Sequence, residues 1–459
     1  MTLAQELARH VAGLDATTLP PDVVAEAKRR LLDFVAATAP AFDREAPARI
    51  ATGYATRAGG AGEATVIVLG DRAPAPLIAF ANGVAGSCLE IDDDHSARVG
   101  HVGTPTVPAA LAAAELAGTS GAGLLAAIVA GYEVYVRTAR AVRPGVLLGK
   151  GFQPSGTNGA FGAAAAAARA LGLSSDRVAH AIGLAGCQSA GLIEGTADGT
   201  WSKRFNPGWA AHAGTSAALL ADAGFTGAPH VLEGRHGWLA AYAGDAADAA
   251  AVLDGIGDRY EILGSVTKPY ACSRYCHSAI DAALALRPRV GTLEEVESVL
   301  VHTFAHGLPF VARPAEAKAA PRTVVDAQFS LPFAVAVALA DGAALLDQFT
   351  PESIARPEVR AIAAATTVTV DPELDVLYPR QYPARLEVRL RDGRTLTSEV
   401  RTPAGDPGNE LDDDRFFARF TELATLAYPR EQVDDILDAV SRLEELDHVR
   451  DLVSLLVRR

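Results

Sequence analysis

A short, densely charged segment lies between two apolar segments, and it limits what this chain can fold into. Residues 90–105 read Glu-Ile-Asp-Asp-Asp-His-Ser-Ala-Arg-Val-Gly-His-Val-Gly-Thr-Pro. The stretches on either side, 76–88 and 107–116, are rich in alanine and predict buried helices. Charged side chains enter apolar surroundings only when they are paired or take part in chemistry. The segment is therefore either a solvated loop with helix-capping aspartates or a functional loop, and other parts of the chain must decide.

Apolar residues at helical spacing run through most of the chain before residue 260. Apolar residues that recur at this spacing over about 11–18 residues are typical of amphipathic or buried helices. The second such segment follows Pro-Pro-Asp, which is a good start signal for a helix. Residues 65–69 are short and β-branched and predict a strand or an extended connector. Helices are expected at 3–13, 22–37, 107–118, 121–141, 159–171, 174–190 and 209–223.

The pattern changes near Tyr260, where alternating and β-branched segments begin. Strands are expected at 296–304, 366–371, 384–390 and 395–400, with Asp392-Gly393 as the hairpin turn, and helices at 327–341, 351–356 and 357–364. The end of the chain is helical again. We therefore expect a mainly α fold with a discontinuous all-helical domain, residues 1–264 and 404–459, and a smaller α+β domain, residues 265–403.

The overall charge restricts the partners. The 459 residues carry a formal net charge of −14, which argues against nucleic acid or an anionic membrane. The N-terminus lacks the pattern of a signal peptide, and no uninterrupted apolar run of about twenty residues predicts a membrane span. The four cysteines show no paired spacing, which favours reduced thiols. We expect a cytoplasmic protein.

Two cationic segments stand out in this acidic chain. Residues 201–209, Trp-Ser-Lys-Arg-Phe-Asn-Pro-Gly-Trp, place Lys203 beside Arg204. This pair suggests a clamp for a carboxylate, although both cations could instead pair with acidic neighbours. Residues 268–277, Lys-Pro-Tyr-Ala-Cys-Ser-Arg-Tyr-Cys-His, fall where the fold class changes, and clefts between domains often hold small ligands.

Other polar segments have weaker signals. The glycine-rich residues 149–159 precede a helix and could bind an anion or simply form a tight turn. Residues 327–333 could provide a wall. A metal site from Asp92, Asp94, His95 and His101 is an alternative, but neighbouring lysines would oppose a cation, so we expect no metal. No Gly-x-Gly-x-x-Gly follows a strand, which argues against a nicotinamide cofactor.

The motifs occur in an order that resembles one known family. They are Glu90-Ile-Asp-Asp, His101-x-Gly, Gly151-Phe-x-Pro-x-Gly-Thr157, Ser202-Lys-Arg-x-x-Pro-Gly-Trp209, Gly224-Phe-Thr-Gly227, Leu232-Glu-Gly234, Lys268-Pro-Tyr270, Arg274, His277 and Ala327-Gln-Phe-Ser-x-Pro-Phe333. Nearly the whole chain is similar to the MmgE/PrpD superfamily, which includes 2-methylcitrate dehydratase, cis-aconitate decarboxylase and iminodisuccinate epimerase. The resemblance implies a helical domain with an α+β lid, a homodimer, and neither metal nor organic cofactor.

The resemblance also implies where the chemistry lies. Family members move a proton at a carbon next to a carboxylate of a small di- or tricarboxylate, and then lose water, lose CO₂ or return the proton to the other face. His101 is the expected base or acid, while Asp92 and Asp93 are expected to be structural and His95 to do nothing chemical. The expected catalytic residues are His101, Lys203, Asp94, Lys150 and Lys268; the expected substrate-binding residues are Glu90, Gln153, Thr157, Arg204, Ser273, Arg274, His277 and Phe333.

Three departures from the family pattern shape the functional expectation. Gln153 and Ser273 replace family histidines, and Phe333 replaces a tyrosine, which removes proton donors and weakens the case for decarboxylation of cis-aconitate. We expect a hydro-lyase of the 2-methylcitrate dehydratase type. An epimerase with His101 and Lys150 on opposite faces of one carbon is the alternative, as is a carboxylate-binding relative without catalysis.

Overall fold

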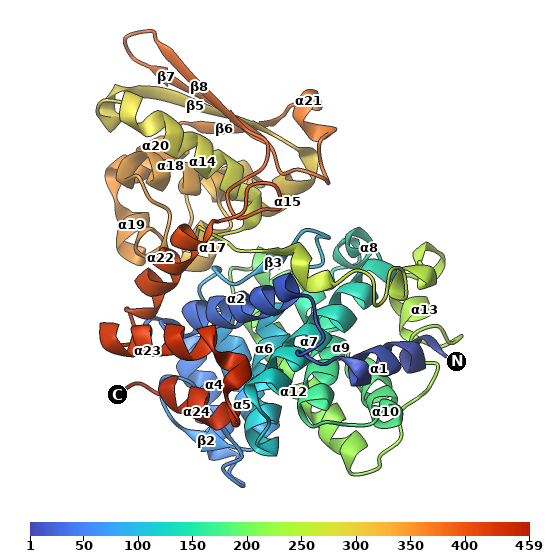
Figure 1. Cartoon of the computed structure of the whole chain (residues 1–459). Coiled ribbons are helices and arrows are strands. Elements are labelled where there is room, and N and C mark those ends of the chain that lie inside the picture. The colour runs from blue at the N-terminus through green and yellow to red at the C-terminus, as the bar shows by residue number, and fades with distance from the viewer.

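The computed structural model describes residues 1–459 and shows a large helical part below a smaller part that contains a sheet (Figure 1). Both chain ends lie in the helical part. Its helices before the sheet are α1 (Leu3–Gly13), α2 (Pro21–Thr38), α3 (Ala41–Arg44), α4 (Ala46–Arg57), α5 (Ala75–Gly86), α6 (Gly103–Ala117), α7 (Gly121–Ala141), α8 (Pro144–Gly149), α9 (Pro154–Ala170), α10 (Ser175–Gly186), α11 (Glu194–Ala197), α12 (Ser202–Asp222) and α13 (Trp238–Tyr242).

Small residues let the central helices pack closely. Gly214 of α12 lies so near α9 that a Cβ at this position would be 2.4 Å from the backbone nitrogen of Ala164. Such an approach excludes any side chain, and it explains why the alanine-rich segments form the core of the bundle. α7 is long and apolar enough to cross a membrane by composition, unlike the expectation from the sequence, but 89% of its apolar window is buried inside the protein.

The upper part is a mixed sheet of four strands in the order β6-β5-β7-β8. β5 (Val296–Thr303) pairs in parallel with β6 (Thr366–Val370), while β7 (Ala384–Leu390) is antiparallel to both β5 and β8 (Thr395–Val400). These bounds match the expected strands to within one residue. The helices of this part are α14 (His277–Leu286), α15 (Leu308–Val311), α16 (Ala315–Ala319), α17 (Val324–Gln328), α18 (Leu331–Asp341), α19 (Pro351–Ala355), α20 (Pro357–Ala364) and α21 (Pro372–Asp375).

Several helix boundaries differ from the expectation. The helix expected at 327–341 is divided into α17 and α18, because Ser330 caps α18 by accepting a hydrogen bond from the Phe333 N–H at 3.1 Å. α9 begins at Pro154 instead of 159, and proline suits the first helical turn. α12 begins at Ser202 instead of 209 and contains Pro207. The cations of residues 201–209 therefore lie on the first turn of a helix and not in a loop.

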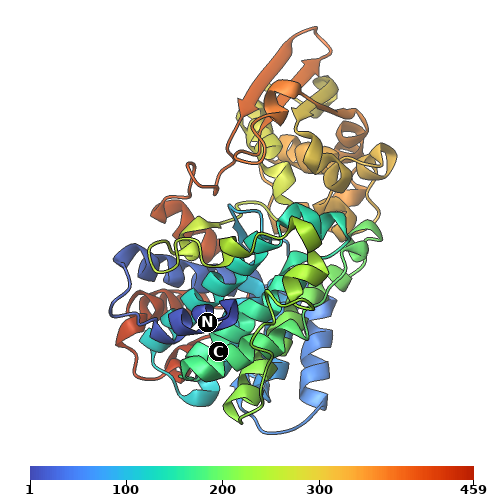
Figure 2. The ribbon, with the colours of Figure 1, turned by 90° about the vertical axis from the view of Figure 1, so that its right-hand side faces the viewer.

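The C-terminal helices α22 (Asp413–Ala424), α23 (Arg430–Ser441) and α24 (Val449–Leu455) return to the helical part (Figures 1 and 2). There α22 and α23 lie against α2, and α24 lies against α6. The buried Arg419 of α22 pairs with Asp33 of α2 at 2.6 Å. The same guanidinium donates to the backbone oxygens of Ile91, at 2.8 Å, and Lys268, at 2.7 Å. One side chain thus holds two polar segments that are far apart in the sequence.

The charged segment of residues 90–105 is mostly buried and not a solvated loop. Glu90, Asp92 and Asp93 are each at most 4% exposed. Within the segment, β3 (Asp94–His95) pairs with β4 (Ser265–Val266), a contact that the sequence pattern did not indicate. A second short pair, β1 (Ala64–Thr65) and β2 (Arg72–Ala73), covers only the start of the extended stretch expected at 65–69.

Candidate active site

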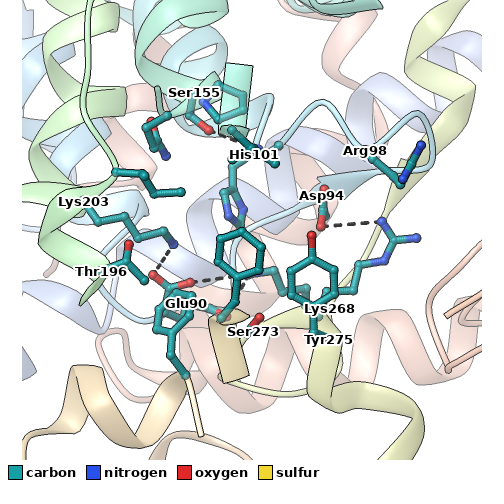
Figure 3. A pocket seen from close by; sticks show the side chains of 18 of the residues that line it. Glu90, Asp94, Arg98, His101, Ser155, Thr196, Lys203, Lys268, Ser273 and Tyr275 are labelled. Atoms are coloured by element: carbon teal, nitrogen blue, oxygen red, sulfur yellow. Dashed lines mark hydrogen bonds and ion pairs between the residues drawn. The ribbon is translucent and has the colours of Figure 1, made fainter. Parts of the chain in front are cut away.

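A pocket opens between the helical part and the sheet-bearing part, where the charged segment meets the starts of α9 and α12 and residues 268–275 (Figure 3). It contains about 790 Å³ of empty space, including its open mouth. Of the 19 residues that line it, six are hydrophobic and eleven are polar or charged. Among the residues expected from the sequence, those that line it are Glu90, Asp94, His101, Gln153, Lys203, Lys268, Ser273 and Arg274.

His101 is held by acceptors on one side of its ring. Its Nδ1 lies 2.8 Å from the backbone oxygen of Asp93 and 3.1 Å from Oδ2 of Asp92. The Asp93 backbone oxygen accepts a hydrogen bond and Asp92 places a negative charge on the same side, so the proton of the neutral ring lies on Nδ1 and Nε2 is free to act as a base. The N–H of His101 also donates to Ser155 Oγ at 3.1 Å. Backbone and side chain are thus both oriented, as a general base requires.

Asp92 is the charged partner of this histidine. Burial opposes its ionisation, but the charges of His101 and Lys268 outweigh burial and hold the pKa of Asp92 well below its usual range. Lys268 Nζ lies 3.6 Å from Asp92 Oδ1. A permanent carboxylate behind the imidazole stabilises the imidazolium that forms when the ring takes a proton. Asp92 therefore has an electrostatic role at the site beyond the structural one expected from the sequence.

Asp93 fixes the end of the loop. Its two carboxylate oxygens accept from the Gly103 N–H at 2.9 and 3.1 Å, and Oδ2 accepts from the Tyr132 hydroxyl at 2.6 Å. Burial raises the pKa of Asp93 to about 7, although Arg30 and the Tyr132 hydrogen bond act in the opposite direction. The carboxyl group thus anchors the start of α6, directly after His101, which agrees with a structural role.

Glu90 joins the two lysines of the pocket. Lys203 Nζ donates to Glu90 Oε1, and Lys268 Nζ donates to the Glu90 backbone oxygen at 3.0 Å. Burial opposes the charge on Glu90, but both lysines outweigh it and lower its pKa. The pKa of Lys268 is raised despite burial, because Asp92 and Glu90 stabilise the ammonium. Glu90 also has a φ of 55°, a strained value for a residue with a side chain, and such strain is concentrated at functional sites.

Arg274 connects the charged segment with the sheet-bearing part and the return of the chain. Its guanidinium forms two hydrogen bonds with Asp406, at 2.5 and 3.0 Å, and lies 3.5 Å from Asp94 Oδ2. Its Cζ is 4.1 Å from the ring centre of Tyr382. Burial opposes the charge on Asp94, but Arg274 outweighs it and lowers the pKa of that carboxyl. Arg274 already contacts two carboxylates and therefore organises the wall of the pocket.

Gln153 has a structural task in addition to its place in the pocket. Its Oε1 accepts from the Gly156 N–H at 2.8 Å, which makes Gln153 the N-cap of α9. The amide oxygen of Gln153 is thereby used by the helix cap, and the NH₂ group remains to contact a ligand. The replacement of the family histidine at this position thus supplies a helix cap that cannot titrate.

Lys150 and Thr157 do not line the pocket, contrary to expectation. Lys150 is exposed, and its Nζ donates to the Tyr242 backbone oxygen at 2.9 Å. Thr157 is buried within α9, where its hydroxyl donates to the Gln153 backbone oxygen at 3.3 Å. Lys150 is therefore not placed to act on the opposite face of a carbon from His101.

Arg204 and His277 also lie outside the pocket. Arg204 follows Lys203 on α12, so it points to another face of the helix and donates to Glu45 Oε2 at 2.5 Å. The alternative that this cation pairs with an acidic neighbour is therefore correct. His277 is buried with Nε2 3.3 Å from the Cys272 backbone oxygen, and burial lowers the pKa of His277 to about 3. It cannot exchange a proton near neutral pH.

The tyrosines of the pocket were not found from the sequence. Phe333, expected in place of a family tyrosine, is 1% exposed and packs on Phe349 in the core of the upper part. Tyr275 and Tyr382 line the pocket instead, so the site does not lack phenolic proton donors. Tyr275 lies inside a segment that was singled out, but nothing in the local pattern marked Tyr382. Phe329 lies in residues 327–333, which were expected to provide a wall. Arg98, Ser155, Thr196, Leu148, Ile193 and Phe310 were also missed.

The side chains of the alternative metal set do not converge. His95 points away from the pocket, with Nε2 2.7 Å from the Glu261 backbone oxygen, and Asp94 faces Arg274. No group of three or more His, Cys, Asp and Glu side chains in residues 1–459 is arranged to hold a metal ion.

Comparison with known proteins agrees with this architecture. Residues 5–250 match the MmgE/PrpD N-terminal domain, and residues 270–445 match the MmgE/PrpD C-terminal domain. The chain is 28% identical to a cis-aconitate decarboxylase-like protein of Aspergillus oryzae, over 98% of this chain and 96% of that protein. It is 26% identical to a cis-aconitate decarboxylase of Aspergillus terreus, over 99% and 96% of the two chains, and 27% identical to the Homo sapiens cis-aconitate decarboxylase, over 99% and 94%. The chain therefore belongs to the MmgE/PrpD family and is a lyase or isomerase.

Proposed function

We propose that this enzyme is a lyase that removes a proton from a carbon next to a carboxylate of a small di- or tricarboxylate, with loss of water as the net reaction. The observation that carries the proposal is that His101, with Asp92 behind its ring, lines the same pocket as Lys203 and Lys268. A base with a buried anionic partner, beside two ammonium groups, provides both components that enolisation of a carboxylate requires.

The proposed step uses each group once. Nε2 of His101 takes the proton from the carbon, and the electron pair moves toward the neighbouring carboxylate to give an enediolate-like anion. Lys203 and Lys268 offset the charge that develops on that group. The C–O bond on the adjacent carbon then breaks, and the leaving hydroxide takes a proton from a phenol to become water. Burial raises the pKa of both Tyr275 and Tyr382, so their hydroxyls remain protonated and available as donors.

Dehydration of a 2-methylcitrate-type hydroxy acid is the finer form of the proposal. It is supported by the phenolic donors in the pocket, which a leaving hydroxide needs. Decarboxylation is the second candidate, and the names of the relatives together with an apolar wall of Leu148, Phe310 and Phe329 favour it, because a less polar surrounding destabilises a carboxylate that must leave as CO₂. Epimerisation with Lys150 as the second group loses its structural basis, since Lys150 lies outside the pocket.

One experiment separates these outcomes. The protein is incubated in D₂O with 2-methylcitrate, citrate and cis-aconitate, and proton and carbon NMR spectra are followed over time. We expect an alkene product and deuterium at the carbon next to a carboxylate from a hydroxy acid. Release of CO₂ from cis-aconitate without an alkene from either hydroxy acid would replace dehydration by decarboxylation. No reaction and no deuterium exchange in any acid would refute the proposed function.

We also propose a cytoplasmic homodimer, which the family resemblance supports. Sedimentation velocity at micromolar concentration should give twice the mass of the 47.6 kDa chain, and a monomer alone would contradict the proposal.

A further inference from the structure

One cation of the pocket has no acidic partner. Four basic side chains line the pocket, namely Arg98, Lys203, Lys268 and Arg274. Lys203 and Lys268 contact Glu90, and Arg274 contacts Asp406. Arg98 forms no ion pair, although it lies in a segment with four carboxylates. The charge of Arg98 is therefore the one in this pocket that the protein leaves uncompensated.

The backbone at Arg98 is held in an unfavourable conformation. Its φ is 59°, in the left-handed region that costs a residue with a side chain about 1–2 kcal/mol relative to glycine. The Arg98 N–H donates to the His95 backbone oxygen at 2.9 Å, and the Ala97 N–H donates to His95 Nδ1 at 3.1 Å. His95, which has no contact with the pocket, thus anchors the turn. An arginine at a position that favours glycine points to a task for its side chain.

The guanidinium of Arg98 contacts the Tyr378 side chain, including its hydroxyl, and no carboxylate. Its Cζ lies 4.6 Å from the ring centre of Tyr378 in the sheet-bearing part. The charged or titratable groups that face it from that part are Tyr378, Tyr382 and His306, and burial together with the charge of Arg98 lowers the pKa of His306. No carboxylate is among them. A guanidinium on an aromatic face keeps its donor edge free for a planar anion, and a carboxylate has the matching geometry.

Figure 3 shows Lys203 and Arg98 on opposite sides of His101. We propose that Arg98 binds the substrate carboxylate that is farthest from the reacting carbon, and that it thereby makes the enzyme select tricarboxylates over dicarboxylates. This inference rests on the proposed function, in which Lys203 and Lys268 bind the carboxylate at the reacting carbon. Arg98 is a specificity-determining residue in this arrangement and takes no part in the proton transfer.

Two unreactive acids test the selectivity directly. Tricarballylate is methylsuccinate with one additional carboxylate on its methyl carbon, so the pair differs by the distant carboxylate that Arg98 would bind. Isothermal titration calorimetry of the wild type should show tricarballylate binding about tenfold or more tightly than methylsuccinate, as a charge-assisted hydrogen-bonded pair provides. In Arg98→Gln this preference should fall to within about twofold, while the affinity for methylsuccinate changes little.

Further variants separate binding from folding. Arg98→Gly removes the side chain and suits the left-handed backbone, so it should lose the preference without loss of thermal stability. Arg98→Lys keeps the charge but not the fork and should retain part of the preference. Arg235 is exposed and outside the pocket, and Arg235→Gln serves as the matched control with wild-type affinities.

The outcomes are distinct from those that test the reaction. Equal affinity of the wild type for the two acids, or an equal loss of affinity for both in Arg98→Gln and Arg98→Gly, would overturn the role of Arg98. These binding measurements do not depend on turnover. A protein that shows the selectivity but transforms no acid would refute the proposed lyase reaction and leave the carboxylate site of Arg98 in place.

Discussion

His101 Nδ1 and Asp92 Oδ2 lie 3.1 Å apart, nine positions apart in one buried loop. Because Asp92 also lies 3.6 Å from Lys268, the carboxylate is shared between the proposed base and a cation of the pocket. The proton that His101 accepts and the charge that Lys268 carries therefore influence one another through Asp92. Removal of this single negative charge should change the chemistry at both groups.

Replacement of Asp92 by asparagine should reduce turnover by about 10- to 100-fold, a loss typical for a partner that orients an essential histidine. The amide cannot stabilise the imidazolium, so the acidic limb of the pH profile of kcat/KM should move to lower pH. His101→Gln should lose about 100- to 10,000-fold at every pH. Steady-state rates between pH 5 and 9 check both, and an unchanged acidic limb in Asp92→Asn would contradict an electrostatic role.

Lys203 and Glu90 should be energetically coupled. Lys203→Met leaves a buried Glu90 without its closest cation, which should destabilise the protein by about 3–5 kcal/mol, whereas the double variant Lys203→Met/Glu90→Gln should recover much of this loss. Turnover should be lost in both, because the reaction needs the ammonium itself. Urea unfolding and rate measurements test the two effects separately.

The exposed Lys150 supplies a matched control for Lys203, because both are lysines and only Lys203 lines the pocket. Lys150→Met should change stability by less than about 0.5 kcal/mol, as surface substitutions usually do, and should leave kcat/KM unaltered.

A recovery of activity in the double variant Lys203→Met/Glu90→Gln would contradict a direct role of the ammonium group. It would show that Lys203 serves only to neutralise Glu90.

Asp93 should make the protein less stable as the pH rises. Its pKa in the folded protein is about 7, above the ordinary value of 3.8, so the folded state binds more protons than the unfolded state between these values. The free energy of unfolding therefore falls with increasing pH across this window, by at most about 1.4 kcal/mol per pH unit from this group, and the loss is complete above pH 7.

Asp93→Asn isolates this contribution, because the amide keeps an acceptor for the Gly103 N–H but cannot ionise. The stability of the wild type relative to Asp93→Asn should fall between pH 5 and pH 8 in urea unfolding experiments. A difference that is the same at pH 5, 6.5 and 8 would mean that Asp93 does not titrate in this range.

The sequence predicted the elements of this fold well where periodicity decides them. α7 and the strands β7 and β8 begin and end where the apolar pattern predicts. The charged residues gathered at the pocket, such as Glu90 and Lys268, could be identified because charge is rare in an alanine-rich chain. Side-chain direction could not be predicted in the same way. Lys203 and Arg204 are neighbours on α12 but point to different faces, and only the helix start at Ser202 decides which one enters the pocket.

Contacts across long sequence separations were also beyond local patterns. Tyr382 lines the pocket, and its ring contacts the guanidinium of Arg274. The two residues are more than a hundred positions apart in the sequence. β3 and β4 have two residues each, which is too short to produce an alternating pattern in the sequence. Such features depend on how the two parts of the chain are placed against each other.

Phe333 and Tyr275 provide the sharpest test of where the proton donors lie. If the core position mattered for chemistry, Phe333→Tyr would restore a family donor and raise activity. The structure predicts the opposite: the ring is 1% exposed against Phe349, so the new hydroxyl should be buried without a partner and cost about 1–3 kcal/mol of stability with no gain in rate. Tyr275→Phe removes a hydroxyl from a pocket-lining ring and should leave stability nearly unchanged while it lowers kcat by about 100-fold. Thermal unfolding and kcat of the two variants, measured together, test this prediction. If the proton donor belonged at position 333, Phe333→Tyr would raise kcat and Tyr275→Phe would not lower it.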